Sequence, residues 1–227
     1  MKVALVLILF LFTLGCAAST APEQLPGSTN KVTPPSRTVR GRALISTRFP
    51  SVLIEFAKPF QYAGAHSFIL YNVADAEQYF FVDAEKDGRI KRMYWVQFEG
   101  YLPSNTHSYD YQVTKTVNIG GFDFIADASA RNIKANPGRP DSDGSRAREF
   151  LTTKGYRLGS DEVLSQRLVY LVDEAKRNEL MIIYIEDLSA MNLTAADLAP
   201  DGKAADQWEK ISAGLLERAT KNMKVAR

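Results

Sequence analysis

Apolar and polar residues alternate with a period of two along several short runs between positions 43 and 131. Such alternation is typical of strands that bury one face. The clearest case is a pair of runs, Gln78 to Ala84 and Arg89 to Glu99, joined by a segment that ends in Asp87-Gly88. Because an Asp-Gly pair readily adopts the positive φ of a tight turn, the sequence predicts a β-hairpin here.

The second run of this hairpin has an apolar side and a polar side. We expect one face to carry the apolar residues Ile90, Tyr94, Val96 and Phe98. The opposite face is expected to carry Lys91, Gln97 and Glu99. Arg92 is the exception, because it falls among the apolar positions. The pattern therefore predicts a strand with one covered face.

Three further runs have the character of strands: 67–73, 107–113 and 122–128. In the second of these, Tyr109 and Tyr111 alternate with polar residues. This spacing predicts that both rings lie on the covered face of the sheet, beside Tyr94. Strands that follow one another through short turns form an antiparallel meander, which is what we expect for the first half of the body.

The period changes beyond the polar loop at 132–145, which is rich in Pro and Gly. Apolar residues at helical spacing predict helices over 160–177 and 206–223, and the apolar run 180–185 has the length of a strand. Strands followed by helices indicate an α+β fold. We expect a single domain, 43–227, in which an antiparallel β-meander is covered on one face by the helices of the second half.

The first fifteen residues have the composition of a signal peptide, with Lys2 followed by an apolar run that is short for a membrane span. The run ends in Leu14-Gly15-Cys16-Ala17, which resembles the lipobox of bacterial lipoproteins, although Thr13 stands where that family usually has an aliphatic residue. The resemblance implies that Cys16 is acylated and becomes the N-terminus. Ordinary signal peptidase cleavage remains the alternative, because Cys16-Ala17-Ala18 also offers small residues.

Cys16 is the single cysteine of the chain, so it has no disulfide partner and lipidation is its expected use. The segment 16–42 is rich in Pro, Ser, Thr and Gly and is expected to be a flexible tether. These features place the protein in the bacterial cell envelope, anchored to a membrane by lipid and facing away from the cytoplasm.

Charge argues against nucleic acid as a partner. The whole chain carries 28 Lys and Arg against 26 Asp and Glu, but several cations lie in the leader and tether. Without Lys2 and the charged residues of 16–42, 23 cations face 25 anions. A body of this balance lacks the concentrated basic surface that nucleic-acid binding requires.

The sequence contains no glycine-rich phosphate loop, zinc-protease helix or nucleophile elbow, so we expect no cofactor. A metal site is not expected either, because the two histidines, His66 and His107, are far apart in the sequence. Asp123 and Asp127 lie on one side of a predicted strand, and two carboxylates so placed leave an envelope hydrolase as an alternative function. We regard an enzyme as the less favoured class.

Aromatic residues gather on the apolar side of the predicted meander. Tyrosine combines an apolar ring with a polar hydroxyl, which suits both a core and the wall of a ligand pocket. The residues expected to line such a pocket are Tyr94, Phe98, Tyr109 and Tyr111. We therefore expect a binding or structural module for a partner protein or a small amphiphilic ligand.

Overall fold

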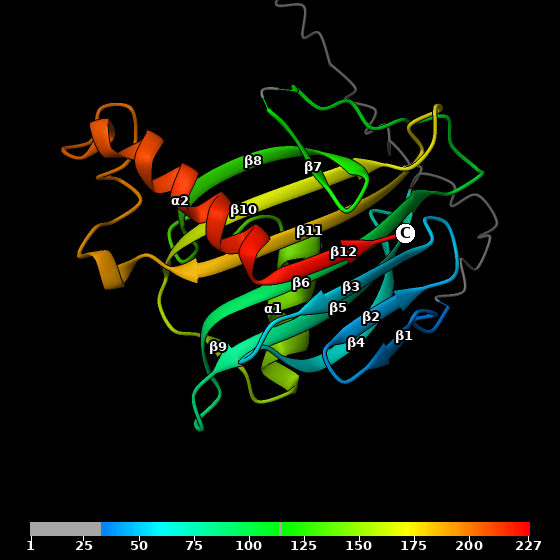
Figure 1. Cartoon of the computed structure of the whole chain (residues 1–227), viewed down its shortest axis with the longest axis horizontal. Coiled ribbons are helices and arrows are strands. Elements are labelled where there is room, and N and C mark those ends of the chain that lie inside the picture. The colour runs from blue at the N-terminus through cyan, green and yellow to red at the C-terminus, as the bar shows by residue number, and fades with distance from the viewer. Residues whose placement is uncertain (1–32, 114) are drawn as a thin grey trace, which may run out of the picture. The chain divides into compact units, whose positions relative to one another are not determined.

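The computed structural model describes residues 33–113 and 115–227, and strands dominate this part of the chain (Figure 1). An eight-stranded sheet has the order β4-β5-β6-β11-β10-β8-β7, with neighbours antiparallel, and the short β9 pairs parallel to β6. Its strands are β4 (Gln61–Leu70), β5 (Ala74–Ala84), β6 (Arg89–Tyr101), β7 (Thr116–Ile119), β8 (Phe122–Asn132), β9 (Arg157–Leu158), β10 (Glu162–Leu171) and β11 (Asn178–Asp187).

A smaller, four-stranded sheet has the order β1-β2-β3-β12 and packs against the large one. Its strands are β1 (Thr38–Arg40), β2 (Ala43–Ser46), β3 (Val52–Phe56) and β12 (Met223–Ala226). The described residues also form helices α1 (Asp143–Thr153) and α2 (Trp208–Lys221) and two short 3-10 turns, η1 (Ser189–Met191) and η2 (Ala205–Gln207).

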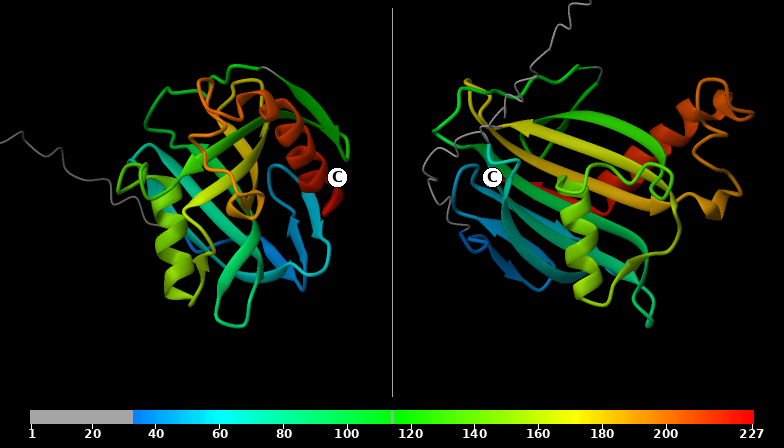
Figure 2. Two further views of the ribbon diagram at one scale, coloured as in Figure 1. Left: turned by 90° about the vertical axis from the view of Figure 1, so that its left-hand side faces the viewer. Right: turned by 180° about the vertical axis from the view of Figure 1, so that it is seen from behind.

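The large sheet is covered on both faces. Its sandwich face packs against the small sheet and α2, through a core that includes Phe56, Tyr94, Ile182, Leu215 and Met223. Its other face, here the α1 face, is crossed by α1, as the view from behind in Figure 2 shows. The core under α1 includes Phe80, Trp95, Leu151 and Ile183. The large sheet is thus the middle layer of the fold.

The α+β prediction is wrong. The fold is mostly antiparallel β-sheet and is closer to a β-sandwich, with α1 and α2 on opposite faces of the large sheet rather than together on one. The meander is present only as β4-β5-β6, because β11 and β10 insert between β6 and β8. This order arises from long-range pairing, which alternation within a single run does not specify.

The helix predicted over 160–177 is also wrong, because this segment forms β10. β10 lies inside the sheet between β11 and β8, where both faces are covered. Leu164 and Leu168 point to the sandwich face, whereas Val163 and Val169 are buried on the α1 face. Residues four apart share a face of a strand as well as of a helix, so Leu164 and Leu168 gave a misleading helical spacing.

Two further corrections concern the expected faces. Residues 107–113 form no strand, and an extended loop takes their place. In β6 a shift of register leaves Lys91 unpaired, so that Ile90 joins Met93 in the core of the α1 face instead of joining Tyr94. Arg92 lies opposite Asp83 of β5 and forms a 2.6 Å ion pair with it, which accounts for a charged residue among apolar positions.

Three other sequence predictions about elements are confirmed, whereas of the run 67–73 only residues up to Leu70 are strand, in β4, and 71–73 form a turn. The hairpin at Asp87-Gly88 joins β5 and β6, and Gly88 has a φ of 82°. The strand at 180–185 is part of β11, and the helix at 206–223 is α2. In the described part of the chain, neither helix has the length and apolarity needed to cross a membrane.

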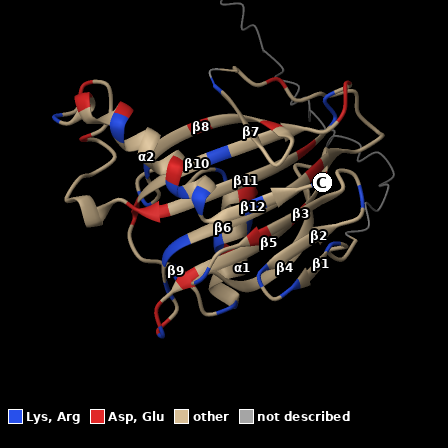
Figure 3. Cartoon of the chain, viewed as in Figure 1, with Lys and Arg blue, Asp and Glu red and all other residues tan. Residues whose placement is uncertain are grey.

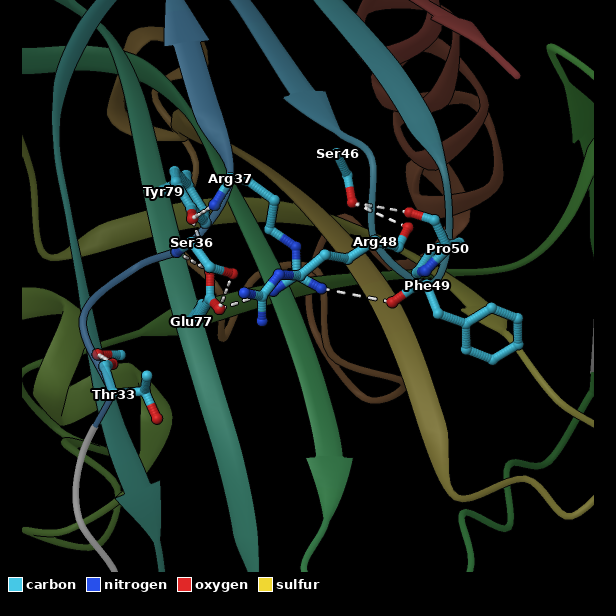
Figure 4. Close-up of polar contacts among 10 residues, drawn as sticks. Thr33, Ser36, Arg37, Ser46, Arg48, Phe49, Pro50, Glu77 and Tyr79 are labelled. Carbon is cyan, nitrogen blue, oxygen red and sulfur yellow. Dashed lines mark hydrogen bonds and ion pairs between the residues drawn. The ribbon is translucent and has the colours of Figure 1, made fainter.

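Part of the segment expected to be tether contributes to the fold (Figure 4). Ser36 donates through its backbone N–H and its hydroxyl to Glu77, and the backbone N–H of Arg37 donates to the Tyr79 hydroxyl. The Arg37 guanidinium pairs with Glu77 at 2.8 Å and lies 3.8 Å above the Phe98 ring. The strand β1 follows directly and pairs with β2.

Candidate functional site

A cavity of about 490 Å³ lies on the α1 face, between α1 and strands β6, β11, β10 and β8. Its floor is apolar and comes from alternate positions of β6 and β11: Met93, Trp95, Met181, Ile183 and Ile185. The helix contributes Ala147 and Leu151, its two buried residues. We call this cavity the α1 groove. Its volume lies in the range of sites that hold small molecules.

Arginines stand around the rim of the α1 groove: Arg131, Arg148, Arg157 and Arg167. Arg167 pairs with Asp127 at 2.9 Å, and Arg157 pairs with Asp87. Within residues 33–113 and 115–227, Arg131 and Arg148 form no ion pair. Two cations are therefore available to an anionic group that enters the groove.

Asp143, at the start of α1, is the least exposed of the three acids that line the groove. Burial raises the pKa of its carboxyl, although the N–H of Gly144 and the charges of Arg167 and Arg131 act in the opposite direction. Charged residues of both signs are otherwise intermixed along the strands (Figure 3). Recognition of a charged ligand therefore depends on local groups such as these arginines.

A row of polar side chains adjoins the groove on the same face and crosses four neighbouring strands. It comprises His66, Gln78, Gln97, Glu99 and Glu179, which we call the polar row. His66 Nε2 lies 2.7 Å from Gln78 Oε1, and Gln78 Nε2 donates to Gln97 Oε1 over 2.8 Å. Gln97 in turn donates to Glu99. Gln97 and Glu99, which were predicted to lie on the polar side of a strand with one covered face, are thus buried.

Glu99 and Glu179 are direct partners on β6 and β11, and each accepts a hydrogen bond from a loop tyrosine. Tyr109 donates to Glu99 over 2.7 Å, and Tyr111 donates to Glu179 over 2.6 Å. Burial, followed by the charge of Glu99, raises the pKa of Glu179 to about 8. Burial also raises the pKa of Glu99. At neutral pH the pair therefore retains a proton on Glu179.

Three residues connect the groove with the polar row. Trp95 lines the groove floor and donates its indole N–H to Gln97 over 3.1 Å. The backbone carbonyl of Asp143 accepts from Gln78. Arg167 lies with its guanidinium carbon 5.3 Å from the centre of the Tyr111 ring. The polar row, together with the Tyr111 ring that is bound to it, therefore contacts groove residues on β6, β10 and α1.

The four residues predicted to bind ligand are divided between the two faces of the large sheet. Tyr94 is buried in the sandwich core, where its hydroxyl donates to the carbonyl of Ala219 over 2.6 Å. Phe98 lies on the same face, under Arg37. Tyr109 and Tyr111 lie together at the polar row, with ring centres 6.2 Å apart. None of the four lines the α1 groove.

The structure also locates the other residues that the sequence analysis considered as catalytic, metal-binding or lipidated. Asp127 lies at the groove rim in its pair with Arg167, whereas Asp123 accepts a hydrogen bond from Asn118. His66 belongs to the polar row, and His107 lies beside Tyr101. Among the described residues, no three or more His, Asp or Glu side chains are grouped to hold a metal ion. Cys16 lies outside the described residues.

The groove arginines were missed because they come from four different elements, which the sequence alone does not bring together. Arg131 is the last residue but one of β8, Arg148 lies on α1, Arg157 on β9 and Arg167 on β10. The unusual density of arginine at 131–167 was the available signal, but it does not show which side chains converge. No protein-family model, no curated protein and no solved structure matches this chain.

Proposed function

We propose that this protein is an envelope lipoprotein, tethered through Cys16, whose folded unit binds a small anionic amphiphile in the α1 groove. The observation that carries the binding proposal is the combination of an apolar floor with unpaired arginines at one rim. An alkyl or ring system gains about 0.8 kcal/mol for each CH₂ group that it buries. The tether is supported by the leader and the unpaired cysteine.

The anionic group is assigned to Arg131 and Arg148. Arg167 is engaged by Asp127, and Arg157 by Asp87. Arg148 already donates to the Pro137 carbonyl and to Ser145, which holds its guanidinium at the rim. A carboxylate or phosphate there gains charge-assisted hydrogen bonds from guanidinium groups that the fold has already positioned.

A hydrolase that uses Asp123 and Asp127 is the less supported alternative. Both side chains are exposed, and each is engaged by a neighbouring residue. Catalytic acids and bases are usually found in clefts that exclude water. We therefore favour binding over catalysis.

Binding is tested with decanoate, monitored by the fluorescence of Trp95. The chain has two tryptophans, so Trp208→Phe leaves Trp95 as the only reporter. In this background, Arg131→Glu with Arg148→Glu is expected to weaken decanoate binding at least about tenfold, because each lost charge-assisted contact contributes about 1.5–3 kcal/mol. Lys134→Glu is the matched control, since Lys134 is exposed near Arg131 but does not line the groove.

Decyltrimethylammonium has a comparable alkyl chain and the opposite charge, and it is expected to bind more weakly than decanoate to the unchanged protein. Equal binding of decanoate by the arginine variant and the Lys134 control would contradict the assigned head-group site. Failure of both amphiphiles to change the Trp95 fluorescence would contradict binding in the groove.

A further inference from the structure

The floor of the α1 groove has two halves of different chemistry. The register of β8, β10, β11 and β6 aligns one residue from each strand in a row on the α1 face: Ser129, Ser165, Ile185 and Met93. All four line the groove. The half over β11 and β6 is apolar, whereas the half over β8 and β10 contains the two serines. Because neighbouring strands lie about 4.8 Å apart, the row spans about 14 Å.

The two serine hydroxyls are open to the groove. Alternation places Ser165 on the α1 face, because Leu164 beside it points into the sandwich core. Ser129 is its direct partner on β8 and shares that face. Both serines are half-buried, and within residues 33–113 and 115–227 neither hydroxyl forms a hydrogen bond or is enclosed by the protein. Two adjacent hydroxyl groups are therefore available to a ligand in the groove.

Asp143 provides a further free acceptor on this side of the groove. Its Oδ1 accepts from the Gly144 N–H over 2.7 Å. In the described part of the chain its other carboxyl oxygen accepts no hydrogen bond and is not enclosed. The carboxyl group lies close enough to Arg131 and Arg167 to interact with their charges, and these arginines follow the two serines by two positions on β8 and β10. The polar half of the groove therefore offers both donors and an acceptor.

We propose that the ligand of the α1 groove is a fatty acid with a hydroxyl group on the third carbon of its chain, an inference that rests on the proposed function. Its carboxylate binds Arg131 and Arg148. Arg131 and Ser129 lie two residues apart on the same face of β8, so the carbons next to the carboxylate lie over the serines. The rest of the chain continues along the row onto Ile185 and Met93.

A hydroxyl group at the third carbon is matched by the groups around it. It accepts from a serine O–H and donates to the free oxygen of Asp143, so both of its hydrogen-bonding roles are used. An unsubstituted chain displaces water from the serines and returns no hydrogen bond, which lowers its affinity. A hydroxyl group at the far end of the chain would instead lie over the apolar floor near Met93 and Trp95, where its desolvation is unfavourable.

The test compares three acids: decanoate, 3-hydroxydecanoate and 10-hydroxydecanoate. Binding is followed by the fluorescence of Trp95 in the Trp208→Phe protein. We expect 3-hydroxydecanoate to bind at least about fivefold more tightly than decanoate, because it gains hydrogen bonds to a serine and to Asp143. In contrast, 10-hydroxydecanoate should bind more weakly than decanoate, although it carries the same functional group.

Ser129→Ala with Ser165→Ala is expected to reduce the preference for 3-hydroxydecanoate over decanoate to about twofold or less, because both donors are removed. Asp143→Ala should reduce the same ratio by removing the acceptor. Each ratio is measured on one protein, so decanoate binding reports whether the groove of that variant is intact. Ser212→Ala is the matched control, since Ser212 is half-buried on α2, which packs on the sandwich face, and it should keep the full preference.

Equal binding of decanoate and 3-hydroxydecanoate by the unchanged protein would overturn this inference and leave the binding of an anionic amphiphile intact. The inference also fails if 10-hydroxydecanoate binds as tightly as 3-hydroxydecanoate, or if the double serine variant keeps the preference of the Ser212 control. If none of the acids changes the Trp95 fluorescence, the groove is not the binding site, and the proposed function is overturned as well.

Discussion

The buried pair Glu99 and Glu179 predicts that Glu179→Gln stabilises the protein at alkaline pH. The folded protein keeps a proton on Glu179 up to about pH 8, whereas the unfolded chain releases it near the ordinary value of 4.5. The folded state therefore binds more protons between these two values, and its stability falls as the pH rises through them. Over this pH interval the free energy of unfolding falls by at most about 5 kcal/mol.

Glutamine has nearly the same shape as glutamate, retains an acceptor for the Tyr111 hydroxyl and does not ionise. At pH 4 the two proteins should therefore have similar free energies of unfolding. At pH 9 the glutamine variant should be more stable by several kcal/mol, approaching the same estimate of about 5 kcal/mol.

Urea unfolding measured at intervals from pH 4 to pH 9 provides the assay. Glu55→Gln, at an exposed position of β3, is the control and should follow the pH dependence of the unchanged protein. Parallel curves for Glu179→Gln and the unchanged protein would refute the reasoning, because Glu179 would then titrate alike in the folded and unfolded states.

Three further predictions concern the N-terminal segment and the core. A chain that starts at Gly41 loses β1 and leaves Glu77 buried without Arg37, so it should unfold with about 3 kcal/mol less stability than a chain that starts at Thr33; equal urea midpoints would contradict this. Tyr94→Phe should cost about 1 kcal/mol in urea unfolding, because its hydroxyl pairs with a buried carbonyl; no loss beyond that of the exposed Tyr71→Phe would contradict this. Cys16→Ser should release the protein from membranes or block its maturation, whereas unchanged membrane retention of a protein with a free thiol would disprove acylation.

The sequence by itself determined the features that depend on neighbouring residues. The Asp87-Gly88 turn formed as predicted because its backbone conformation is set by those two residues. The helix α2 formed because its apolar stripe, with Leu215 and Ala219 buried, has the period of one helix face. The strand at 180–185 was recognised from its short apolar run, which is buried on both faces.

The tertiary structure alone decided which strands are neighbours and which faces are covered. Gln97 and Glu99 have the alternation of an exposed face, but α1 and the loop with Tyr109 bury them. The pairing of β6 with β11 brings Glu179 opposite Glu99, although the two residues are eighty positions apart. Alternation indicates only that the two sides of a strand differ. In β10, which is buried on both sides, the spacing of the apolar residues also resembles that of a helix.

The candidate sites depend on the same long-range order. Arg131 and Arg148 both line the α1 groove because β8 and α1 border one cavity, and Arg37 lies near Asp75 because the segment before β1 lies against β5. No local pattern requires these pairs to approach. They converge because burying both faces of the large sheet brings together side chains from distant parts of the chain, and the hydrophobic energy that drives this burial does not depend on sequence separation.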